Sequence, residues 1–228
     1  MNLAEKICVV IPAYREAPRI GAVVRAVHAQ SLAVVVVDDG STDTTAAEAE
    51  VAGAQVLRHP VNRGKGAALA TAFQFVREHG YTTVITMDGD GQHDPKDLSA
   101  LLAVQQQMGA AVVIGNRMAN RANMPHIRRW TNQLMSWLLS RCVQQQIPDT
   151  QCGYRLYHVD VLPTQPLGAT GYAAESEILL DLAARGIHIT SAPVRTIYRQ
   201  EKSKINPVID TLRFFGMMLR RAAWRKRG

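Results

Sequence analysis

Short apolar runs alternate along this chain with longer segments in which apolar residues recur at helical spacing. One such run, residues 34–37, consists of four consecutive valines, as expected for a strand buried on both faces of a sheet. Strands of this kind occur in parallel sheets, where a helix carries the chain from one strand to the next. The sequence therefore predicts an α/β fold with a mostly parallel central sheet flanked by helices. Its 228 residues are enough for one large domain.

The positions of the expected elements follow from this alternation. We expect strands over residues 7–11, 34–37, 55–57, 82–87, 111–115 and 187–194. We expect helices near residues 20–27 and over residues 67–78, 95–107, 129–142, 175–185 and 207–224. Ser41 and Thr42 are suited to cap the helix after the second strand. Residues 144–153 are expected to form a polar loop, so the second half is predicted to be less regular than the first.

The net charge of +7 is concentrated near the C-terminal end of the sequence. Six basic residues and no acidic residue lie between positions 213 and 228, so the preceding part is nearly neutral. The predicted 207–224 helix has an apolar face but too many arginines to span a bilayer, so it would either lie on an anionic membrane surface or pack on its own domain. We expect a single domain over residues 1–206. A basic amphipathic helix over 207–228 would follow it.

The cysteine pattern favours a reducing compartment. Cys8, Cys142 and Cys152 form no C-x-x-C pair and leave one thiol over, which argues against a disulfide framework or a zinc knuckle. The first residues lack the features of a signal peptide. We therefore expect a cytoplasmic protein, either soluble or peripheral on the inner face of the membrane.

Polar clusters follow three of the expected strands, at residues 12–16, 38–41 and 88–93. The carboxyl ends of parallel strands share one edge of the sheet, where ligands bind in folds of this type. One acidic residue after a strand is commonplace in turns and helix caps. Three such clusters on one edge indicate a binding site.

The third cluster contains Asp88-x-Asp90, in which two carboxylates on a tight turn can reach one divalent cation that bridges a diphosphate. A calcium loop is excluded, because its ligand pattern fails at Gln92, His93 and Ser99. An isolated D-x-D is more often a plain turn, but its context among the three polar clusters favours the metal site. His93 is expected to be a loop or cap residue rather than a metal ligand.

The segment Gly64-Lys65-Gly66 could cradle phosphate through backbone N–H groups at a helix start, or could simply allow close packing. It lacks the Walker spacing, and Leu69 replaces the third glycine of the dinucleotide fingerprint. Neither an NTPase nor a Rossmann dehydrogenase is supported.

Taken in order, these motifs resemble those of family-2 glycosyltransferases of the GT-A fold. The segments are PAYRE, VVVVDDGSTD, NRGKGAA, DGDGQHDP, GNR, DTQCGYR, the helix with Glu175 and Glu177, and SKINP. The similarity covers about residues 6–207 and is greatest to the polyprenyl-phosphate sugar transferases, such as dolichyl-phosphate mannose synthase. It implies a Rossmann-like sheet in a domain with a nucleotide-binding half (1–117) and a less regular acceptor half (118–206).

The resemblance also implies roles for individual residues. The nucleotide would be held by Pro12, Tyr14, Glu16, Val37, Asp39, Lys65, Asp88, Gly89 and Asp90. Mg²⁺ or Mn²⁺ would be bound by Asp88, Asp90 and the carbonyl of Gln92, and phosphate by Arg117, Arg129, Arg199 and Lys204. Asp88, Asp90, Arg117 and Lys204 would carry the chemistry. Gly89 stands where relatives usually have Ala, and the spacing from Arg199 to Lys204 is one residue shorter.

The implied reaction transfers a hexose, with inversion, from a nucleoside diphosphate sugar to an acceptor that is most simply a polyprenyl phosphate. A lipid phosphate is already ionised, whereas a sugar hydroxyl needs a base, for which Asp149 and Glu177 are the candidates. Both are equally explained as partners of Arg155 or Arg117. Of the pair Glu175 and Glu177, Glu175 is expected to be exposed.

Three other classes of protein are disfavoured. A nucleic-acid-binding protein would fit the basic pI of 9.6, but only 6% of residues are aromatic and no recognition motif is present, so no nucleic acid is expected as a partner. A nucleotidyltransferase would need a glycine-rich basic signature after the first strand, where this chain has PAYRE. Processive polysaccharide synthases carry Q-x-x-R-W, which is missing here. The donor sugar and nucleotide stay open.

Overall fold

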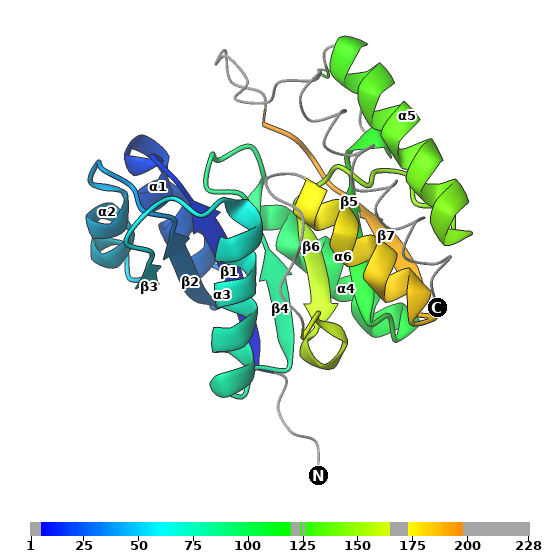
Figure 1. Cartoon of the computed structure of the whole chain (residues 1–228). Coiled ribbons are helices and arrows are strands. Elements are labelled where there is room, and N and C mark those ends of the chain that lie inside the picture. Colours follow the sequence, from blue (N-terminus) through cyan, green and yellow to red (C-terminus); the bar gives the residue numbers. More distant parts are fainter. Residues whose placement is uncertain (1–5, 120–123, 125, 165–172, 198–228) are drawn as a thin grey trace.

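The computed structural model describes residues 6–119, 124, 126–164 and 173–197, and its centre is a seven-stranded sheet (Figure 1). The strand order is β3-β2-β1-β4-β6-β5-β7. The strands are β1 (Ile7–Ala13), β2 (Ala33–Asp38), β3 (Gln55–Arg58), β4 (Thr83–Thr86), β5 (Val112–Asn116), β6 (Arg155–His158) and β7 (Ile189–Pro193). All neighbouring pairs are parallel except those of β6, which runs antiparallel to β4 and β5. The predicted mostly parallel α/β sheet is confirmed.

Helices cover both faces of this sheet. They are α1 (Ala17–His28), α2 (Thr45–Val51), α3 (Lys65–Glu78), α4 (Leu98–Met108), α5 (His126–Val143) and α6 (Ala173–Ala184), with short 3₁₀ turns at η1 (Pro95–Asp97), η2 (Arg117–Ala119) and η3 (Val159–Val161). In Figure 1, α3 and α6 lie in front of the sheet and α5 lies outside α6. Among the described residues, no helix is both long and apolar enough to cross a bilayer.

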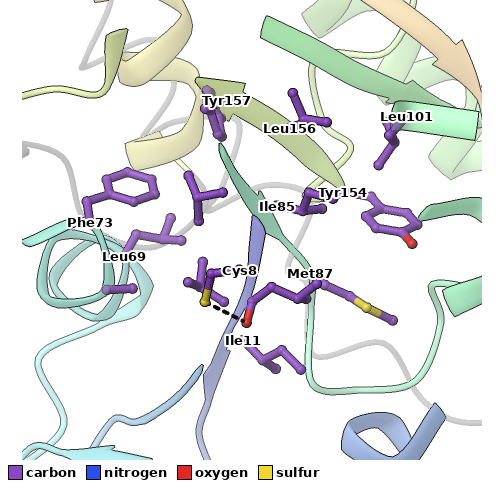
Figure 2. Close-up of a cluster of buried hydrophobic side chains, with 14 of the residues drawn as sticks. Cys8, Ile11, Leu69, Phe73, Ile85, Met87, Leu101, Tyr154, Leu156 and Tyr157 are labelled. Atoms are coloured by element: carbon purple, nitrogen blue, oxygen red, sulfur yellow. Dashed lines mark hydrogen bonds between the residues drawn. The ribbon is translucent and has the colours of Figure 1, made fainter. Parts of the chain in front are cut away.

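The core lies between the central strands and α3. The residues of β1 and β2 pair in register from Cys8 with Ala33 to Ala13 with Asp38, and most of their side chains are buried. Phe73 of α3 meets Tyr157 of β6 edge to face, with ring centroids 6.0 Å apart, so aromatic packing joins this helix to the sheet (Figure 2). This packing fixes the start of α3, which carries Lys65 at the edge of the sheet.

The strand β6 was not predicted, because its four residues do not form an apolar run. Arg155 begins it and is completely buried. Its guanidinium donates to the carbonyl oxygens of Cys152 at 2.7 Å, Thr150 at 2.9 Å and Glu175 at 2.7 Å. A buried charge is tolerated when its donors are satisfied in this way. Arg155 thereby ties the loop before β6 to the start of α6.

The expected capping of α2 was wrong. The helix begins after Thr44, whose side chain makes no capping hydrogen bond. Ser41 instead accepts a hydrogen bond from the backbone N–H of Arg15 at 2.9 Å, which joins the loops after β1 and β2. The predicted helix over residues 207–228 lies outside the described residues.

Candidate active site

The three polar clusters come together at one edge of the sheet. β1 lies between β2 and β4, so the loops that leave the carboxyl ends of these strands are neighbours. The backbone of Gly89, in the loop after β4, faces Ile11 and Ala13 of β1. From β1 the chain first continues to β2 and β3 on one side and then crosses to β4 on the other side. In open α/β sheets, ligands bind at the carboxyl ends of the strands where the order reverses in this way.

Asp88 lies at the centre of a charged cluster. Its Oδ1 is 2.5 Å from the ammonium of Lys65, at the start of α3, and the same ammonium lies 3.2 Å from Oε1 of Glu175 on α6. The backbone of Gly153 approaches so closely that a Cβ there would lie 2.9 Å from Asp88 Oδ2. Burial raises the pKa of Asp88, but the Lys65 charge and His93 outweigh it and hold this pKa well below its ordinary value. Asp88 is therefore ionised.

Asp90 faces the opposite electrostatic situation. Burial, and then the charge of Asp88, raise the pKa of Asp90 above its ordinary value. Its Oδ1 accepts from the backbone N–H of Gln92 at 2.9 Å, which keeps the turn tight. The carbonyl of Gln92, a predicted metal ligand, accepts from the N–H of Ile197 at 2.9 Å. Two adjacent carboxylates that oppose each other's ionisation are the donor set a divalent cation stabilises.

His93 lies beside this turn and is buried. Its Nε2 is 3.4 Å from Asp88 Oδ2, and its ring packs against Tyr154 with centroids 4.9 Å apart. Residue 93 also forms an isolated antiparallel bridge with Thr196. In the described part of the chain, no group of three or more His, Cys, Asp or Glu side chains is arranged to hold a metal. The expectation that His93 is a loop residue agrees with these contacts.

Asp39, predicted to hold the base or ribose, already organises the loop before α3. Its Oδ1 accepts from the N–H of Arg63 at 2.9 Å and lies 2.7 Å from Nδ1 of His59, and its Oδ2 accepts from the N–H of Gly64 at 2.7 Å. A carboxylate offers about four acceptor sites, so about one is left for a ligand. Asp39 therefore fixes the loop that leads into Lys65.

The other predicted nucleotide residues surround the same edge. Tyr14 is exposed, with the guanidinium of Arg15 over its ring at 5.2 Å. Glu16 is buried at the start of α1 and pairs with Arg19 at 3.0 Å. Pro12 is half-buried at the end of β1, next to Val37 in β2. Val37 is completely buried in the core, so its side chain has no surface exposed at this edge of the sheet.

Arg117 and Asp149 form a bidentate ion pair at the carboxyl end of β5. Nε of Arg117 donates to Asp149 Oδ2 at 2.7 Å, and its Nη2 donates to Oδ1 at 2.9 Å. Asp149 is completely buried. Of the two readings of Asp149, this geometry is that of a partner that positions Arg117. Arg129, also predicted to engage phosphate, is half-buried in the first turns of α5.

The expected exposure of Glu175 was wrong. Glu175 is buried, because α6 turns its carboxylate toward Lys65, whereas Glu177 is half-buried. Cys152 is a packing thiol as expected, since it is completely buried and burial raises its pKa to about 12. Arg199 and Lys204 lie outside the described residues.

Sequence reasoning missed two residues that shape the site. His59 directly follows β3, with one ring nitrogen against Asp39 and the other, Nε2, 2.9 Å from Thr71 Oγ1. Gly153 leaves room for the carboxylate of Asp88. The glycine in Cys152-Gly153-Tyr154 was visible in the sequence, but a close approach between distant segments has no local signal.

The chain belongs to glycosyl transferase family 2. The model of that family matches residues 8–164, which span the sheet from β1 through β6 and include the Asp88 and Asp149 clusters. The family predicted from the motifs is confirmed, and with it the assignment of the chain as a glycosyltransferase.

Among characterised relatives, the polyprenol monophosphomannose synthase of Mycolicibacterium smegmatis is 30% identical over 210 residues, covering 86% of this chain and 79% of that protein. The UDP-N-acetylglucosamine–dolichyl-phosphate N-acetylglucosaminyltransferase of Methanococcus voltae is 28% identical over 222 residues, covering 87% of this chain and 88% of that protein. The first is named for its polyprenol monophosphomannose product and the second for its dolichyl-phosphate acceptor, so both names include the kind of lipid carrier used by the subgroup that the motifs resemble.

The fold is GT-A, as predicted. The crystal structure of glucosyl-3-phosphoglycerate synthase from Mycobacterium tuberculosis, solved with Mn²⁺, UDP and glucosyl-3-phosphoglycerate, superposes with a TM-score of 0.73 at 22% identity. The match covers 96% of this chain and 80% of that one.

Proposed function

We propose that this protein transfers a hexose, with inversion, from a nucleoside diphosphate sugar to a polyprenyl phosphate, with Mg²⁺ or Mn²⁺ bound at Asp88 and Asp90. The observation that carries the proposal is the pair of carboxylates at the edge between β1 and β4, close to the ammonium of Lys65. The acceptor class is supported by the two relatives whose names include a lipid carrier of this kind.

The residues of the D-x-D turn fit a hard divalent cation. Mg²⁺ sites of this type use one or two carboxylates and take further oxygens from substrate phosphates. When bound, the cation would neutralise negative charge that develops on the leaving diphosphate. Asp88 and Asp90 would hold it, and the Gln92 carbonyl is a further candidate ligand.

The protein's own basic residues add to this stabilisation. Lys65 reaches into the site from the start of α3 and lies between Asp88 and Glu175. Arg117 is held by Asp149 at the carboxyl end of β5. Arginine and lysine at fixed positions stabilise phosphate charge without reorganisation during the reaction. We assign Lys65 to the donor diphosphate and Arg117 to phosphate on the acceptor side.

The carboxylates on the acceptor side favour an acceptor that needs no deprotonation. Both oxygens of Asp149 accept hydrogen bonds from Arg117, and the carboxylate of Glu175 faces Lys65. Glu177, the other candidate base, is half-buried on α6. A lipid phosphate is already a nucleophilic anion at neutral pH, so it requires none of these groups as a base.

A panel of radiolabelled GDP- and UDP-sugars, each incubated with polyprenyl phosphate in detergent and Mn²⁺, tests the proposal. We expect label from one donor to enter the lipid, with loss of transfer in EDTA and in Asp88→Asn and Asp90→Asn. Transfer only to a free glycan hydroxyl would contradict the lipid acceptor and identify the sugar-hydroxyl alternative. Transfer that is unaffected by EDTA would contradict the metal.

We further propose that the enzyme acts on the cytoplasmic face of a membrane as a peripheral protein. In this arrangement residues 1–206 form the catalytic domain, and the basic segment 207–228 adds electrostatic attraction to anionic lipid. Sedimentation with liposomes at low and high salt tests this, since attraction of this kind weakens with ionic strength.

A further inference from the structure

Helix α5 presents four large apolar side chains to solvent. Ile127 is 70% exposed, Trp130 74%, Leu134 50% and Trp137 55%. They are separated by three, four and three positions, so at 100° per residue they fall within an arc of roughly 80°. We call these four residues the α5 stripe. Contiguous apolar surface of this kind is uncommon on soluble proteins and marks a site of interaction.

The α5 stripe is not the face that packs on the protein. Met135 and Leu139 are buried, and they lie on the opposite side of the helix, where α5 contacts α6. A surface helix normally has one apolar face and one polar face. Here the second face is apolar as well, so the exposure of the α5 stripe does not follow from the needs of the core.

Helix α5 carries basic residues and no acidic residue. At 100° per residue, Arg141 lies on the side of the α5 stripe, whereas Arg129 lies about 120° from the centre of the stripe. The guanidinium of Arg141 lies 5.5 Å from the ring centre of Trp137, one turn further along the same side of the helix. Exposed tryptophans flanked by arginines are typical of the boundary between headgroups and acyl chains, where the rings are half-buried and the charges meet lipid phosphates.

Helix α5 is also coupled to the acceptor side of the site. Ser136, on its packed side, accepts from the backbone N–H of Thr150 at 2.9 Å. Asp149, the preceding residue, holds the guanidinium of Arg117. The position of α5 therefore determines where the predicted phosphate-binding arginine lies.

We propose that the α5 stripe docks on an anionic lipid bilayer, with its apolar side chains among the headgroups and α5 parallel to the surface. This inference rests on the proposed function, because a polyprenyl phosphate acceptor resides in such a membrane. Docking through α5 presents the Arg117 side of the enzyme to the layer that holds the acceptor phosphate.

Charge distinguishes a bilayer from the other possible occupants. The segment 207–228 of this chain carries six basic residues and one acidic residue, Asp210, so it would bring like charge to a basic helix. A second copy docked through the same stripe would also bring like charge. An anionic lipid surface complements Arg141 and the α5 stripe together, because they lie on the same side of the helix.

Tryptophan fluorescence gives a direct test. The chain has three tryptophans, Trp130, Trp137 and Trp224, so the variant Trp224→Phe leaves only the two of the α5 stripe as reporters. With vesicles of brominated phosphatidylglycerol, we expect a blue shift and quenching in this full-length variant, and neither with brominated phosphatidylcholine. Vesicle binding without quenching would place the contact elsewhere and overturn the proposal.

A charged substitution tests the energetics. Leu134→Glu should weaken binding to phosphatidylglycerol vesicles at least tenfold, because an apolar contact is lost and a charge is placed among the lipids. The control is Val51→Glu, at an 83% exposed position on α2, which adds the same charge far from α5. Equal weakening in the two variants, or in neither, would contradict docking through the α5 stripe. A change in oligomeric state by light scattering, with vesicle binding intact, would assign the α5 stripe to self-association instead.

The proposal and the proposed function can fail separately. With a short-chain, water-soluble polyprenyl phosphate, Leu134→Glu should transfer sugar as fast as the unmodified protein. With the long-chain acceptor in vesicles, it should be slower. If transfer to both acceptors is absent in the unmodified protein, the proposed function is wrong. If transfer occurs and Leu134→Glu slows both reactions equally, the docking proposal is wrong.

Discussion

The carboxylate of Asp39 lies 2.7 Å from the imidazole Nδ1 of His59, and both side chains are buried. The opposite ring nitrogen of His59 lies 2.9 Å from the hydroxyl of Thr71 on α3. Asp39 also accepts from two backbone N–H groups in the loop that leads to Lys65. The carboxylate of Asp39, just after β2, is thus fixed by His59, just after β3, which is itself held by α3. Through Asp39 these contacts fix the loop beside the D-x-D turn.

Replacing His59 with Phe should weaken nucleotide binding more than turnover. The change removes a hydrogen bond to a buried carboxylate, and we expect a loss of about 1–3 kcal/mol in the free energy of unfolding. The KM for the donor should rise because the loop before Lys65 is no longer held. Urea unfolding and donor titration measure the two effects.

The conservative variant His59→Asn separates positioning from general damage. Its side-chain amide can donate from nearly the place of Nδ1, so it should recover much of the donor affinity while losing the Thr71 contact. If Asn binds donor as poorly as Phe, the contact with Asp39 does not position the loop.

Substitution by alanine should be tolerated at one of the two glycines near Asp88 and damaging at the other. A Cβ at Gly89 would meet Ile11 at 3.4 Å, an ordinary contact, so Gly89→Ala should keep activity and change the free energy of unfolding by less than about 1 kcal/mol. A Cβ at Gly153 would lie 2.9 Å from Asp88 Oδ2 and 3.0 Å from Glu175 Oε1. Gly153→Ala should displace Asp88 and lower kcat/KM about tenfold or more. Similar kinetics for the two variants would refute this reading of the cluster.

A double-mutant cycle on Arg117 and Asp149 tests whether Asp149 positions the arginine or acts as a base. Asp149→Asn should cost about 3 kcal/mol of stability, because it leaves Arg117 without its buried partner. If Asp149 only positions Arg117, adding Asp149→Asn to Arg117→Met should lower kcat little further. Additive losses would instead show that Asp149 acts independently of Arg117, as a base would.

The three cysteines should differ sharply in reactivity. Cys142 is exposed, whereas Cys8 and Cys152 are buried, and burial raises the pKa of each of these two to about 12. At pH 8 a thiol with this pKa is ionised to only about one part in 10⁴. Iodoacetamide should therefore modify one cysteine in the folded protein and all three in denaturant, as counted by intact mass. Rapid modification of Cys152 in the folded protein would contradict its role as a packing thiol.

The parts of the fold that could be predicted are those with a local signal. The valine run of β2 and the polar residues after β1, β2 and β4 identified the parallel half of the sheet and its binding edge. β6 had no such signal, because it begins with an arginine whose burial depends on carbonyl groups from two other segments. Its strand character is set by tertiary structure rather than by propensity.

The site shows the same division. The motifs placed Asp88, Asp90 and Asp39 at one edge, but the partners of these residues come from elsewhere in the sequence. The orientation of Glu175 could not be read from helical spacing, because Glu175 and Glu177 are two positions apart and the ammonium of Lys65 determines which one is buried. Serine is a residue type typical of helix caps, yet the hydroxyl of Ser41 accepts a hydrogen bond that joins two loops.

The antiparallel strand β6 interleaves the two predicted halves of the chain. It comes from the acceptor half, yet it is inserted between β4 and β5, which belong to the nucleotide half. A chimera that joins residues 1–117 of this protein to the acceptor half of a relative would therefore replace an internal strand of its own sheet. Recombination at that boundary requires the foreign strand to pair with both β4 and β5. Acceptor specificity within this architecture is therefore more readily exchanged by changing loops and helices than by exchanging halves.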